Sequence, residues 1–462
     1  MIETRRIPWA WLTNGAFAAI GCAMVGFTRQ LIREYSHFTI GFSGVSSWML
    51  VLYLMAVLIF LIKPSNVNRY TFWIIVGFAI ACRVVALIPA PYLSTDVYRY
   101  AWDGVVQHAH INPYRYVPAD PALTFLQAPN QDLYDHINRR DYARTIYPPA
   151  AQILFYLLTF VSPTVTFMKL AMVLFEGLTL FGLVRLLREM GLQREWTLLY
   201  AWFPMLVWEF AGSGHLDSIV MAFMVFALLF RYREQTVLTG LFLGLAVLTK
   251  FYPLVLFPAL YRRGDWKMPA TMAGVALVLY APYLSVGKMV LGFLGGYVDE
   301  EGMADGTRYF PLEWAQHLPG LQEISNAAYL AFVAAVFLAL MVWAWRTGCR
   351  RDSPKGAFLW PAFGLALALM LLFSPHYPWY VAWLVPFLVL LPNLTVMTYV
   401  CGLFYLCTTA LAVGYGPKQF QLNEILYGIV AIAFIIEMVG RKVPLVRGWT
   451  QSLHHASSTT AN

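Results

Sequence analysis

A set of ionisable side chains stands out because each lies at the end of an apolar segment. They are Asp96, Asp103, Glu209, His215, Asp217, Lys250 and His376. Burying charge at the edge of a membrane is costly, so such residues are functional candidates. The residue types suit acid–base chemistry. An ionised aspartate can remove a proton from a hydroxyl group, and a lysine with a histidine can neutralise a departing phosphate.

The densest cluster is the stretch YLSTDVYRYAWDG, which begins at residue 92 and follows about twenty apolar residues. A plain connecting loop does not need two aspartates, an arginine and several aromatic rings in so short a space. Asp96 is our candidate for a general base, and Arg99 would keep its carboxylate ionised by opposite charge. Arg99 and Asp103 are also candidates for substrate binding.

The same stretch has a purely structural interpretation. Ser94 or Thr95 could cap a helix that runs from about residue 96 to residue 110, with Asp96 complementing the helix dipole. Arg99 would then form an i,i+3 ion pair with Asp96 and an i,i+4 ion pair with Asp103. Both interpretations remain open at this point.

Three further clusters place polar groups in short connectors. They contribute Glu209, His215 and Asp217 in WEFAGSGHLDS, Lys250 in LTKFYP, and His376 and Tyr377 in SPHYPWY. We expect Lys250 and His376 to bind a donor phosphate and the others to bind substrate. Each cluster also has a simpler interpretation: a turn with local hydrogen bonds around His215, a lysine that snorkels to the interface, and a histidine satisfied within its loop.

The composition indicates a polytopic membrane protein. Of 462 residues, 60% are hydrophobic and only 12% are charged, whereas soluble proteins carry roughly 25% charged residues. The net charge of +8 could suggest nucleic acid as a partner. The basic residues cluster instead in short connectors between apolar runs, as the positive-inside rule expects of cytoplasmic loops. We therefore expect membrane lipids and no nucleic acid as partners.

The apolar runs define the predicted spans, each of which needs about 17–25 residues. They cover residues 8–28, 43–62, 70–90, 165–187, 196–212, 216–231, 236–249, 251–261, 268–287, 323–346, 356–373, 378–392, 394–413 and 422–440. The pair 236–249 and 251–261 is too short for two crossings, so we expect a hairpin or broken helix that bends near Pro253. The predicted fold class is all-α, with about 12–14 transmembrane helices.

The predicted topology places the N-terminus inside. It depends on the apolar segment 148–161, which is short and opens with two prolines, and which we expect to lie at the outer interface. A large first external loop at 91–164 would then carry short interfacial helices, and a second external loop would cover 288–322. The sequence further predicts an N-terminal helix pair at 1–68, a transmembrane catalytic domain at 69–440 and a disordered cytoplasmic tail at 441–462.

Several familiar signals are absent from the sequence. The cysteines form no CxxC motif, and no D-x-D motif of the kind that binds a metal and a nucleotide sugar occurs. We expect no disulfide, no metal site and no cofactor. The acidic run at 298–305 is expected to be a solvated loop. Trp379, Tyr380 and Trp383 are expected to belong to the interfacial aromatic belt.

The candidate residues together favour glycosyl transfer from a lipid-phosphate sugar. Carboxylates, a lysine, two histidines and several aromatic rings would face one cavity beside the lipid, and aromatic rings are common platforms for sugars. The competing class is a transporter or flippase for a lipid-linked or anionic substrate, because broken helices near charged residues are typical of transporters. We find no internal repeat, and the polar residues lie at the outer edge of the membrane.

The sequence also resembles a known group of enzymes. STDVYRYAWDG, INPYRYVPADP and IYPPAAQILF are similar to the first external loop of bacterial GT-C membrane glycosyltransferases of the family 87 and polyprenol-phosphate mannosyltransferase type. GHLDSIVM, GLAVLTKFYPLVLFP and SPHYPWYVAWLVPF continue the resemblance in order, over roughly residues 70 to 390. Members often place this loop after the first span, whereas two extra spans precede it here.

The resemblance implies an activity and a location. Asp96 matches the position of the base that is proposed in such enzymes, and His376 matches a histidine near the donor phosphate. The expected reaction is an inverting transfer of a hexose, most often mannose, from a polyprenyl-phosphate donor to a glycolipid or glycan acceptor. The expected location is the plasma membrane, with the site facing the periplasm or the cell exterior.

Overall fold

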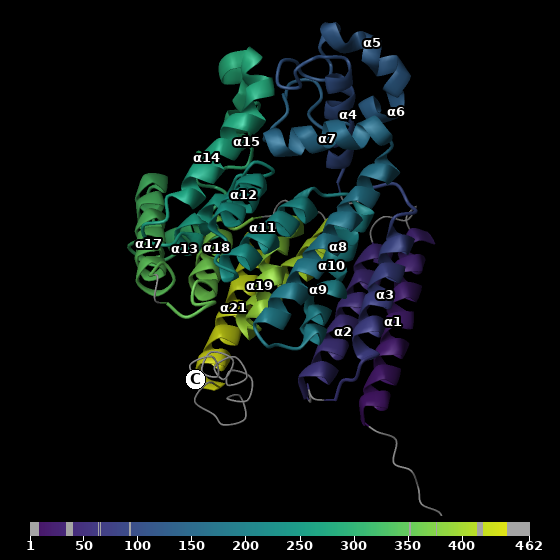
Figure 1. Ribbon diagram of the computed structural model, residues 1–462, viewed down its shortest axis with the longest axis vertical. Helices are drawn as coiled ribbons and strands as arrows, with labels where there is room; N and C mark the ends of the chain where they lie inside the picture. The colour runs from purple at the N-terminus through teal and green to yellow at the C-terminus, as the bar shows by residue number, and fades with distance from the viewer. Residues whose placement is uncertain are drawn as a thin grey trace, which may run out of the picture.

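The computed structural model describes residues 9–33, 40–62, 64, 66–91, 94–350, 353–375, 377–413 and 419–440. Within these ranges every regular element is a helix (Figure 1). The predicted all-α class is therefore confirmed. The predicted cytoplasmic tail at 441–462 lies outside the described residues.

Six helical stretches of the described chain are long and apolar enough to cross a membrane. They are Trp9–Ile32, Gly44–Ile62, Val165–Glu189, Lys267–Glu300, Asn326–Thr347 and Gln419–Val439. A bent pair, Pro204–Gly212 with Asp217–Tyr232, would count as a seventh span. Six shorter apolar helices accompany them. The chain is thus a polytopic membrane protein, and the count of about 12–14 crossings stays a prediction.

The N-terminal helices pack together and against the rest of the bundle. The elements are α1 (Trp9–Arg33), α2 (Ile40–Ile62), α3 (Thr71–Ala86), α8 (Val165–Glu189) and α20 (Leu394–Val413). Helix α1 packs on α2 and α3 (Figure 1). Helix α2 also packs on α20. A buried ion pair joins α3 to α8, with Arg83 Nη2 2.7 Å from Glu176 Oε1. Each charge compensates the other, which a buried group requires.

The end of α3 is fixed by a buried lysine. Lys169, in α8, donates hydrogen bonds to the carbonyl groups of Ala86, Leu87 and Pro89, the last at 2.6 Å. The last carbonyls of a helix have no partner within the helix, so a cation is well placed there. This contact holds the point at which the chain leaves α3 for the Asp96 segment.

Two helices beyond α3 lie side by side. They are α4 (Asp96–His108) and α7 (Pro149–Val161), and the short helices α5 (Thr124–Gln127) and α6 (Gln131–Asp135) lie between them in the chain. The helix expected from about residue 96 is confirmed. Gly104 permits the close packing of α4 on α7, since a Cβ atom there would lie 2.6 Å from the Phe155 carbonyl oxygen.

Helix α7 is too short to cross a bilayer. Its 13 residues span about 20 Å at 1.5 Å per residue, against a hydrocarbon core of about 30 Å. It lies across the direction of the long helices (Figure 1). These features agree with a helix at the interface, which stays a prediction.

Breaks in two other helical segments place polar residues. As predicted, the 236–261 segment is broken: α12 (Thr236–Val247) ends before Lys250, and short helices follow at Tyr252–Leu256 and α13 (Phe257–Leu260). The segment that we predicted as one continuous span at 196–212 is divided among the short pieces η4 (Arg194–Thr197), α9 (Leu198–Ala201), α10 (Pro204–Leu206) and η5 (Val207–Gly212). The chain then turns by 118° into α11 (Asp217–Tyr232).

The C-terminal half completes the bundle and supplies one wall of the site. Its elements are α14 (Lys267–Tyr280), η7 (Ala281–Leu291), α15 (Leu294–Glu300), α16 (Phe310–Gln316), α17 (Asn326–Thr347), α18 (Leu359–Phe373), η8 (Pro378–Leu384), α19 (Val385–Leu390) and α21 (Gln419–Gly440). The run from α14 to α15 rises beside α7 (Figure 1). There Phe293 packs edge-on against Tyr142, so this run closes over the 138–147 segment.

Candidate active site

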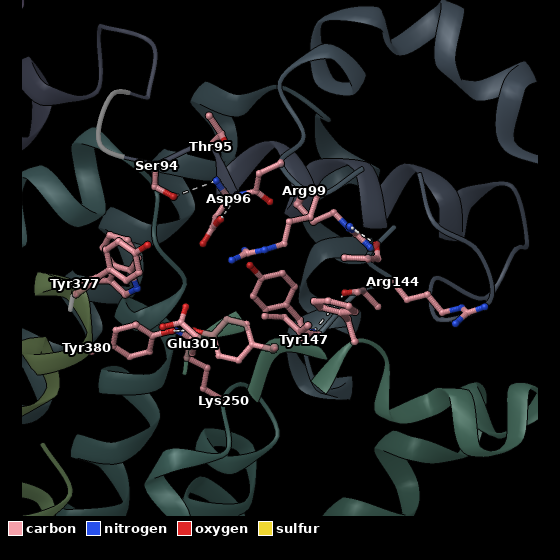
Figure 2. A pocket seen from close by; sticks show the side chains of 18 residues that line it. Ser94, Thr95, Asp96, Arg99, Arg144, Tyr147, Lys250, Glu301, Tyr377 and Tyr380 are labelled. Carbon is pink, nitrogen blue, oxygen red and sulfur yellow. Dashed lines mark hydrogen bonds between the residues drawn. The ribbon is translucent and has the colours of Figure 1, made fainter. Parts of the chain in front are cut away.

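A cavity of about 420 Å³ opens where five separate parts of the chain meet. Its walls come from residues 94–99 at the start of α4, the 138–147 connector, Lys250, residues 293–301 and residues 377–380. Four of the predicted site residues line it, namely Asp96, Arg99, Lys250 and Tyr377. Figure 2 shows Asp96 on one side of this space, with Lys250, Glu301 and Tyr380 on the opposite side.

Asp96 is held by two polar contacts at the beginning of α4. Its backbone N–H donates to Ser94 Oγ at 3.2 Å, and its Oδ1 accepts a hydrogen bond from Asn138 Nδ2 at 2.8 Å. The N-terminal end of a helix also favours a negative charge. The half-buried carboxylate is therefore oriented toward the cavity and supported as an anion, as a proton acceptor requires.

Arg99 does not pair with Asp96, contrary to one of our expectations. Its Nε lies 2.8 Å from Asp103 Oδ1, which confirms the predicted i,i+4 ion pair, and its Nη1 donates to the Ala143 carbonyl. The i,i+3 pair is not formed because Asp103 and Ala143 already take the guanidinium. Asn138 occupies the place at Asp96 that we had given to the arginine.

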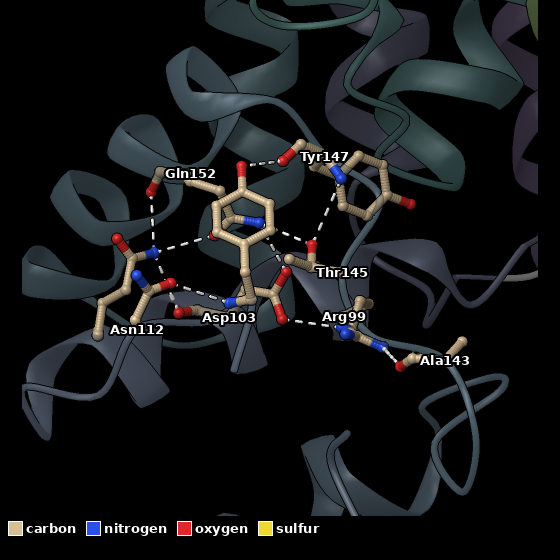
Figure 3. A network of polar contacts seen from close by, with 9 residues as sticks. Arg99, Asp103, Asn112, Ala143, Thr145, Tyr147 and Gln152 are labelled. Atoms are coloured by element: carbon tan, nitrogen blue, oxygen red, sulfur yellow. Dashed lines mark hydrogen bonds and ion pairs between the residues drawn. The ribbon is translucent and has the colours of Figure 1, made fainter. Parts of the chain in front are cut away.

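Asp103 is placed in a buried polar network and does not line the cavity. Gln152 Nε2, from α7, donates to its second oxygen at 2.8 Å and to Thr145 Oγ1 at 2.7 Å (Figure 3). Thr145 itself lines the cavity. Asp103 thus joins α4, α7 and the cavity wall, and we expect it to position the site without touching substrate.

Lys250 and Asp217 form one unit. Lys250 Nζ lies 2.7 Å and 3.0 Å from the two Asp217 oxygens, and the Tyr252 hydroxyl donates to Asp217 Oδ1 at 3.0 Å. The Asp217 side chain is fully buried, whereas 18% of the Lys250 side chain is exposed, toward the cavity. The lysine ammonium also lies 4.9 Å from the centre of the Tyr380 ring. Predicted site residues from two separate connectors thus meet in one place.

The remaining predicted residues lie behind the wall. His215 and Glu209 are buried, with His215 Nε2 3.3 Å from Glu209 Oε2. The His215 ring stacks on Trp379 with centroids 4.1 Å apart, and Trp379 stacks on Tyr377 at 4.5 Å. They support the aromatic side of the cavity, since neither His215 nor Glu209 lines it. His376 lies outside the described residues.

Some lining residues were missed by the sequence analysis. Asn138, Arg139, Tyr297, Glu301 and Tyr380 all line the cavity. Tyr380, which we assigned to the interfacial belt, contacts the Tyr297 hydroxyl through its own hydroxyl. The density of basic residues in INRRDYART was the signal that could have drawn attention to Arg139.

The acidic run at 298–305 is not simply a solvated loop, which corrects our expectation. Glu300 Oε2 lies 2.7 Å from Arg139 Nε, and Glu301 pairs with Arg308 while it lines the cavity. Burial lowers the pKa of the Arg139 guanidinium, but the Glu300 carboxylate outweighs this and the pKa is raised. Arg139 therefore stays cationic. These ion pairs attach the α15 region to the 138–147 connector.

The charges of the lining favour an anionic ligand beside Asp96. Arg99, Arg139, Arg144 and Lys250 line the cavity, against the carboxylates of Asp96 and Glu301. Figure 2 shows that Arg144 points away from Asp96 and Lys250. Burial raises the pKa of the Tyr147 hydroxyl well above its usual value. Tyr147 therefore contributes a neutral ring and hydroxyl at physiological pH.

Replacing Asn138 with alanine should lower the turnover rate by about tenfold, because a hydrogen bond to a charged group contributes about 1.5–3 kcal/mol. The KM of the donor should change little, since Asn138 contacts the carboxylate of Asp96. Steady-state kinetics of the purified variant would measure both. Asn130→Ala, at an asparagine before α6 whose side chain donates to the Leu126 carbonyl, is the control. Equal rates for the two variants would contradict the role of Asn138.

Comparison with known proteins identifies the family. The family model of glycosyltransferase family 87 matches residues 145–375. The chain belongs to glycosyltransferase family 87. The matched range contains Tyr147, Lys250 and Glu301, whereas Asp96 and Tyr377 lie outside it. No curated protein and no solved structure matches the chain.

Membership of family 87 settles the class of activity. The protein is a membrane glycosyltransferase, which uses a sugar donor and an acceptor, and it is of the GT-C type that the sequence resembles. The family thereby favours the enzyme over the transporter that we considered from the sequence. The resemblance by motifs extended over roughly residues 70 to 390, and the family match lies within that range.

Proposed function

We propose that the protein transfers a hexose, which we take to be mannose, from a polyprenyl-phosphate donor to a hydroxyl group of a glycolipid or glycan acceptor. The observation that carries the proposal is a single cavity in which the Asp96 carboxylate and the Lys250 ammonium stand on opposite sides. A base for the acceptor and a cation for a phosphate leaving group are the two polar parts that such a transfer needs.

The reaction is an inverting single displacement. The acceptor hydroxyl donates a hydrogen bond to Asp96, and its oxygen attacks the anomeric carbon of the sugar. The new carbon–oxygen bond forms as the bond between that carbon and the phosphate oxygen breaks, and the hydroxyl proton passes to Asp96. Polyprenyl phosphate leaves with the electron pair of the broken bond. The configuration at the anomeric carbon inverts because attack and departure take place on opposite faces.

The phosphate is stabilised on the Lys250 side of the cavity. Negative charge develops on the leaving oxygen, and a fixed cation in a partly dehydrated site stabilises that charge in the transition state. Asp217 holds the ammonium in place through both of its oxygens. His376 remains our proposal for a second phosphate contact, since its neighbour Tyr377 lines the cavity.

The sugar ring would lie among the tyrosines. Tyr147, Tyr297, Tyr377 and Tyr380 line the same cavity as Asp96 and Lys250. Aromatic rings present flat apolar faces to a sugar, and their hydroxyl groups donate and accept hydrogen bonds. Mannose is proposed from the resemblance to polyprenol-phosphate mannosyltransferases.

Donor class can be tested with purified protein. With polyprenyl-phosphate mannose and a membrane glycolipid extract, we expect turnover that chelators hardly change. With nucleotide sugars alone we expect none, because the proposed leaving group is a lipid phosphate. Polyprenyl-phosphate glucose in parallel tests the choice of sugar. Robust turnover with a nucleotide sugar would refute the proposed donor.

We also propose that the cavity opens to the outer face of the plasma membrane. In a Cys22→Ser background, Tyr142→Cys should react with a membrane-impermeant maleimide added to intact cells, because Tyr142 is 57% exposed beside the cavity. Arg188→Cys, near the C-terminal end of α8, should react only after the cells are made permeable. The reverse pattern would overturn the topology and the outer-face reaction with it.

A further inference from the structure

A second cavity, of about 680 Å³, lies at the other end of α4. It is bounded by the end of α4, the 110–116 connector, α7 and η7, and it shares no lining residue with the catalytic cavity. Among its lining residues are Gln107, His110, Arg115, Tyr116, Tyr156 and Ser285. None of the residues that we predicted from the sequence lines it.

This cavity is built by specific contacts between distant segments. Asn112 Nδ2 donates to the Tyr283 carbonyl at 3.0 Å and to Ser285 Oγ at 3.1 Å. The Tyr283 hydroxyl donates in turn to Gln107 Oε1 at 2.8 Å. These bonds clamp η7 to the end of α4. The walls of the second cavity are therefore fixed relative to one another.

The lining has the chemistry of a carbohydrate site. Amide and hydroxyl groups can both donate and accept, which matches the hydroxyl groups of sugars, and the rings of Tyr116 and Tyr156 offer apolar faces. Arg115 is the cation of the lining, His110 is its other basic side chain, and the lining contains no carboxylate. The cavity thus suits a glycan that is neutral or carries a phosphate, and it disfavours a cation.

A single polar layer separates the two cavities. Gln107 Nε2 donates to Gln152 Oε1 at 3.1 Å, and Gln152 donates to Thr145, which lines the catalytic cavity (Figure 3). Arg144, another catalytic-cavity residue, donates through Nε to the Arg115 carbonyl at 3.1 Å. The polar layer that holds Asp103 beside the catalytic cavity therefore also forms a wall of the second cavity.

The second cavity is bordered by apolar surface. Leu157 and Phe160 of α7 are 54% and 74% exposed, and Leu284 of η7 is 61% exposed. Exposed apolar side chains on helices of a membrane protein face lipid. A ligand in this cavity could therefore keep an attached hydrocarbon chain in the bilayer.

We propose that the second cavity binds the non-reacting sugars of a lipid-anchored acceptor while the acceptor hydroxyl reaches Asp96. The proposal rests on the proposed function. Contacts remote from the reacting atoms can supply binding energy that orients the acceptor hydroxyl at the base. Arg115 and Tyr116 would then recognise the acceptor, at a distance from the cations that surround the donor phosphate.

Crosslinking in living cells tests what occupies the cavity. The photoreactive residue p-benzoylphenylalanine replaces Tyr116, cells are irradiated, and adducts on the purified chain are analysed by mass spectrometry. We expect adducts that contain hexoses. The same residue at Leu277, which is 74% exposed on α14, should capture phospholipid alone. Phospholipid adducts alone at position 116, or no adduct, would overturn the proposal.

Kinetics supply an independent measurement. Arg115→Ala should raise the apparent KM for acceptors in a membrane glycolipid extract by roughly tenfold, with kcat nearly unchanged, because a charged hydrogen bond is lost. Arg185→Ala is the control, because Arg185 is an exposed arginine on α8 that does not line the second cavity. An unchanged KM would contradict acceptor binding here.

The two proposals fail in distinguishable ways. Hexose adducts should persist at position 116 when Asp96→Asn is added, since that change leaves the second cavity intact. If the chain that keeps Asp96 shows no transfer but the adducts form, the proposed function is wrong and the glycan site remains. If transfer depends on Asp96 but no hexose adduct forms, the second cavity does not bind the acceptor.

Discussion

Asp96→Asn should lower the rate of glycosyl transfer by about 10²- to 10⁴-fold, which is the usual contribution of general acid–base catalysis. The amide keeps the size of the side chain and can still contact Asn138, but it cannot accept the proton of the acceptor hydroxyl. Donor affinity should change little, because the phosphate is held on the Lys250 side of the cavity. Steady-state kinetics with a separate measurement of donor binding would check both expectations.

The same substitution decides between the two interpretations of this aspartate. If Asp96 only begins α4, asparagine is about as good at the start of a helix, and activity should survive. Thr95 makes no side-chain capping hydrogen bond, so the helix does not depend on it either. Asp120→Asn is the matched control, at an aspartate whose side chain caps the helix at Pro121–Leu123 and does not line the cavity. An active Asp96→Asn enzyme would refute the assignment of the base.

The fold was predictable wherever its signals are local. Apolar runs located the helices, and the polar start of α4 was readable from the Asp96 segment. Pro253 correctly marked the break after α12. The turn between η5 and α11 was predicted as a connector, but the division of residues 196–212 into short pieces was missed, because a π-helix at Val207–Gly212 has no distinct sequence pattern.

The candidate site was predictable only in part, because most of its walls depend on partners far away in the chain. Lys250 and Asp217 stood out as polar residues among apolar ones, but nothing local indicated that they pair. Glu300 and Glu301 looked like part of a solvated acidic run, but Arg139 pairs with Glu300 and Arg308 pairs with Glu301. Asn138 carries no charge and lies in a polar loop, so composition did not distinguish it.

The pairing of Arg99 shows how a plausible local rule can give a wrong partner. Spacing allowed an ion pair with Asp96 or with Asp103, and the structure forms the second. Ala143 and Gln152 decide the outcome, because they complete the hydrogen bonds of Arg99 and Asp103 in a buried layer. A buried polar network is stable only when its members are satisfied, and that condition involves three segments of the chain.

Lys250→Met should reduce both stability and donor binding. The carboxylate of Asp217 is fully buried and would keep only the hydrogen bond from Tyr252. Breaking a buried ion pair by removing one partner costs about 3–5 kcal/mol. Loss of the cation should also raise the KM of the donor by roughly 10- to 100-fold, because a charge-assisted hydrogen bond to phosphate is lost. Thermal unfolding in detergent and donor kinetics would measure the two effects.

A double variant separates the structural role of Lys250 from its catalytic role. Adding Asp217→Asn to Lys250→Met removes the uncompensated buried charge, so most of the lost stability should return. Donor binding should not return, because the cavity still lacks the ammonium group that faces it. If the double variant regains both stability and donor binding, Lys250 serves only to neutralise Asp217. The phosphate must then be bound by another cation of the lining, such as Arg139. Recovery of stability alone would place Lys250 at the departing phosphate, opposite the Asp96 base.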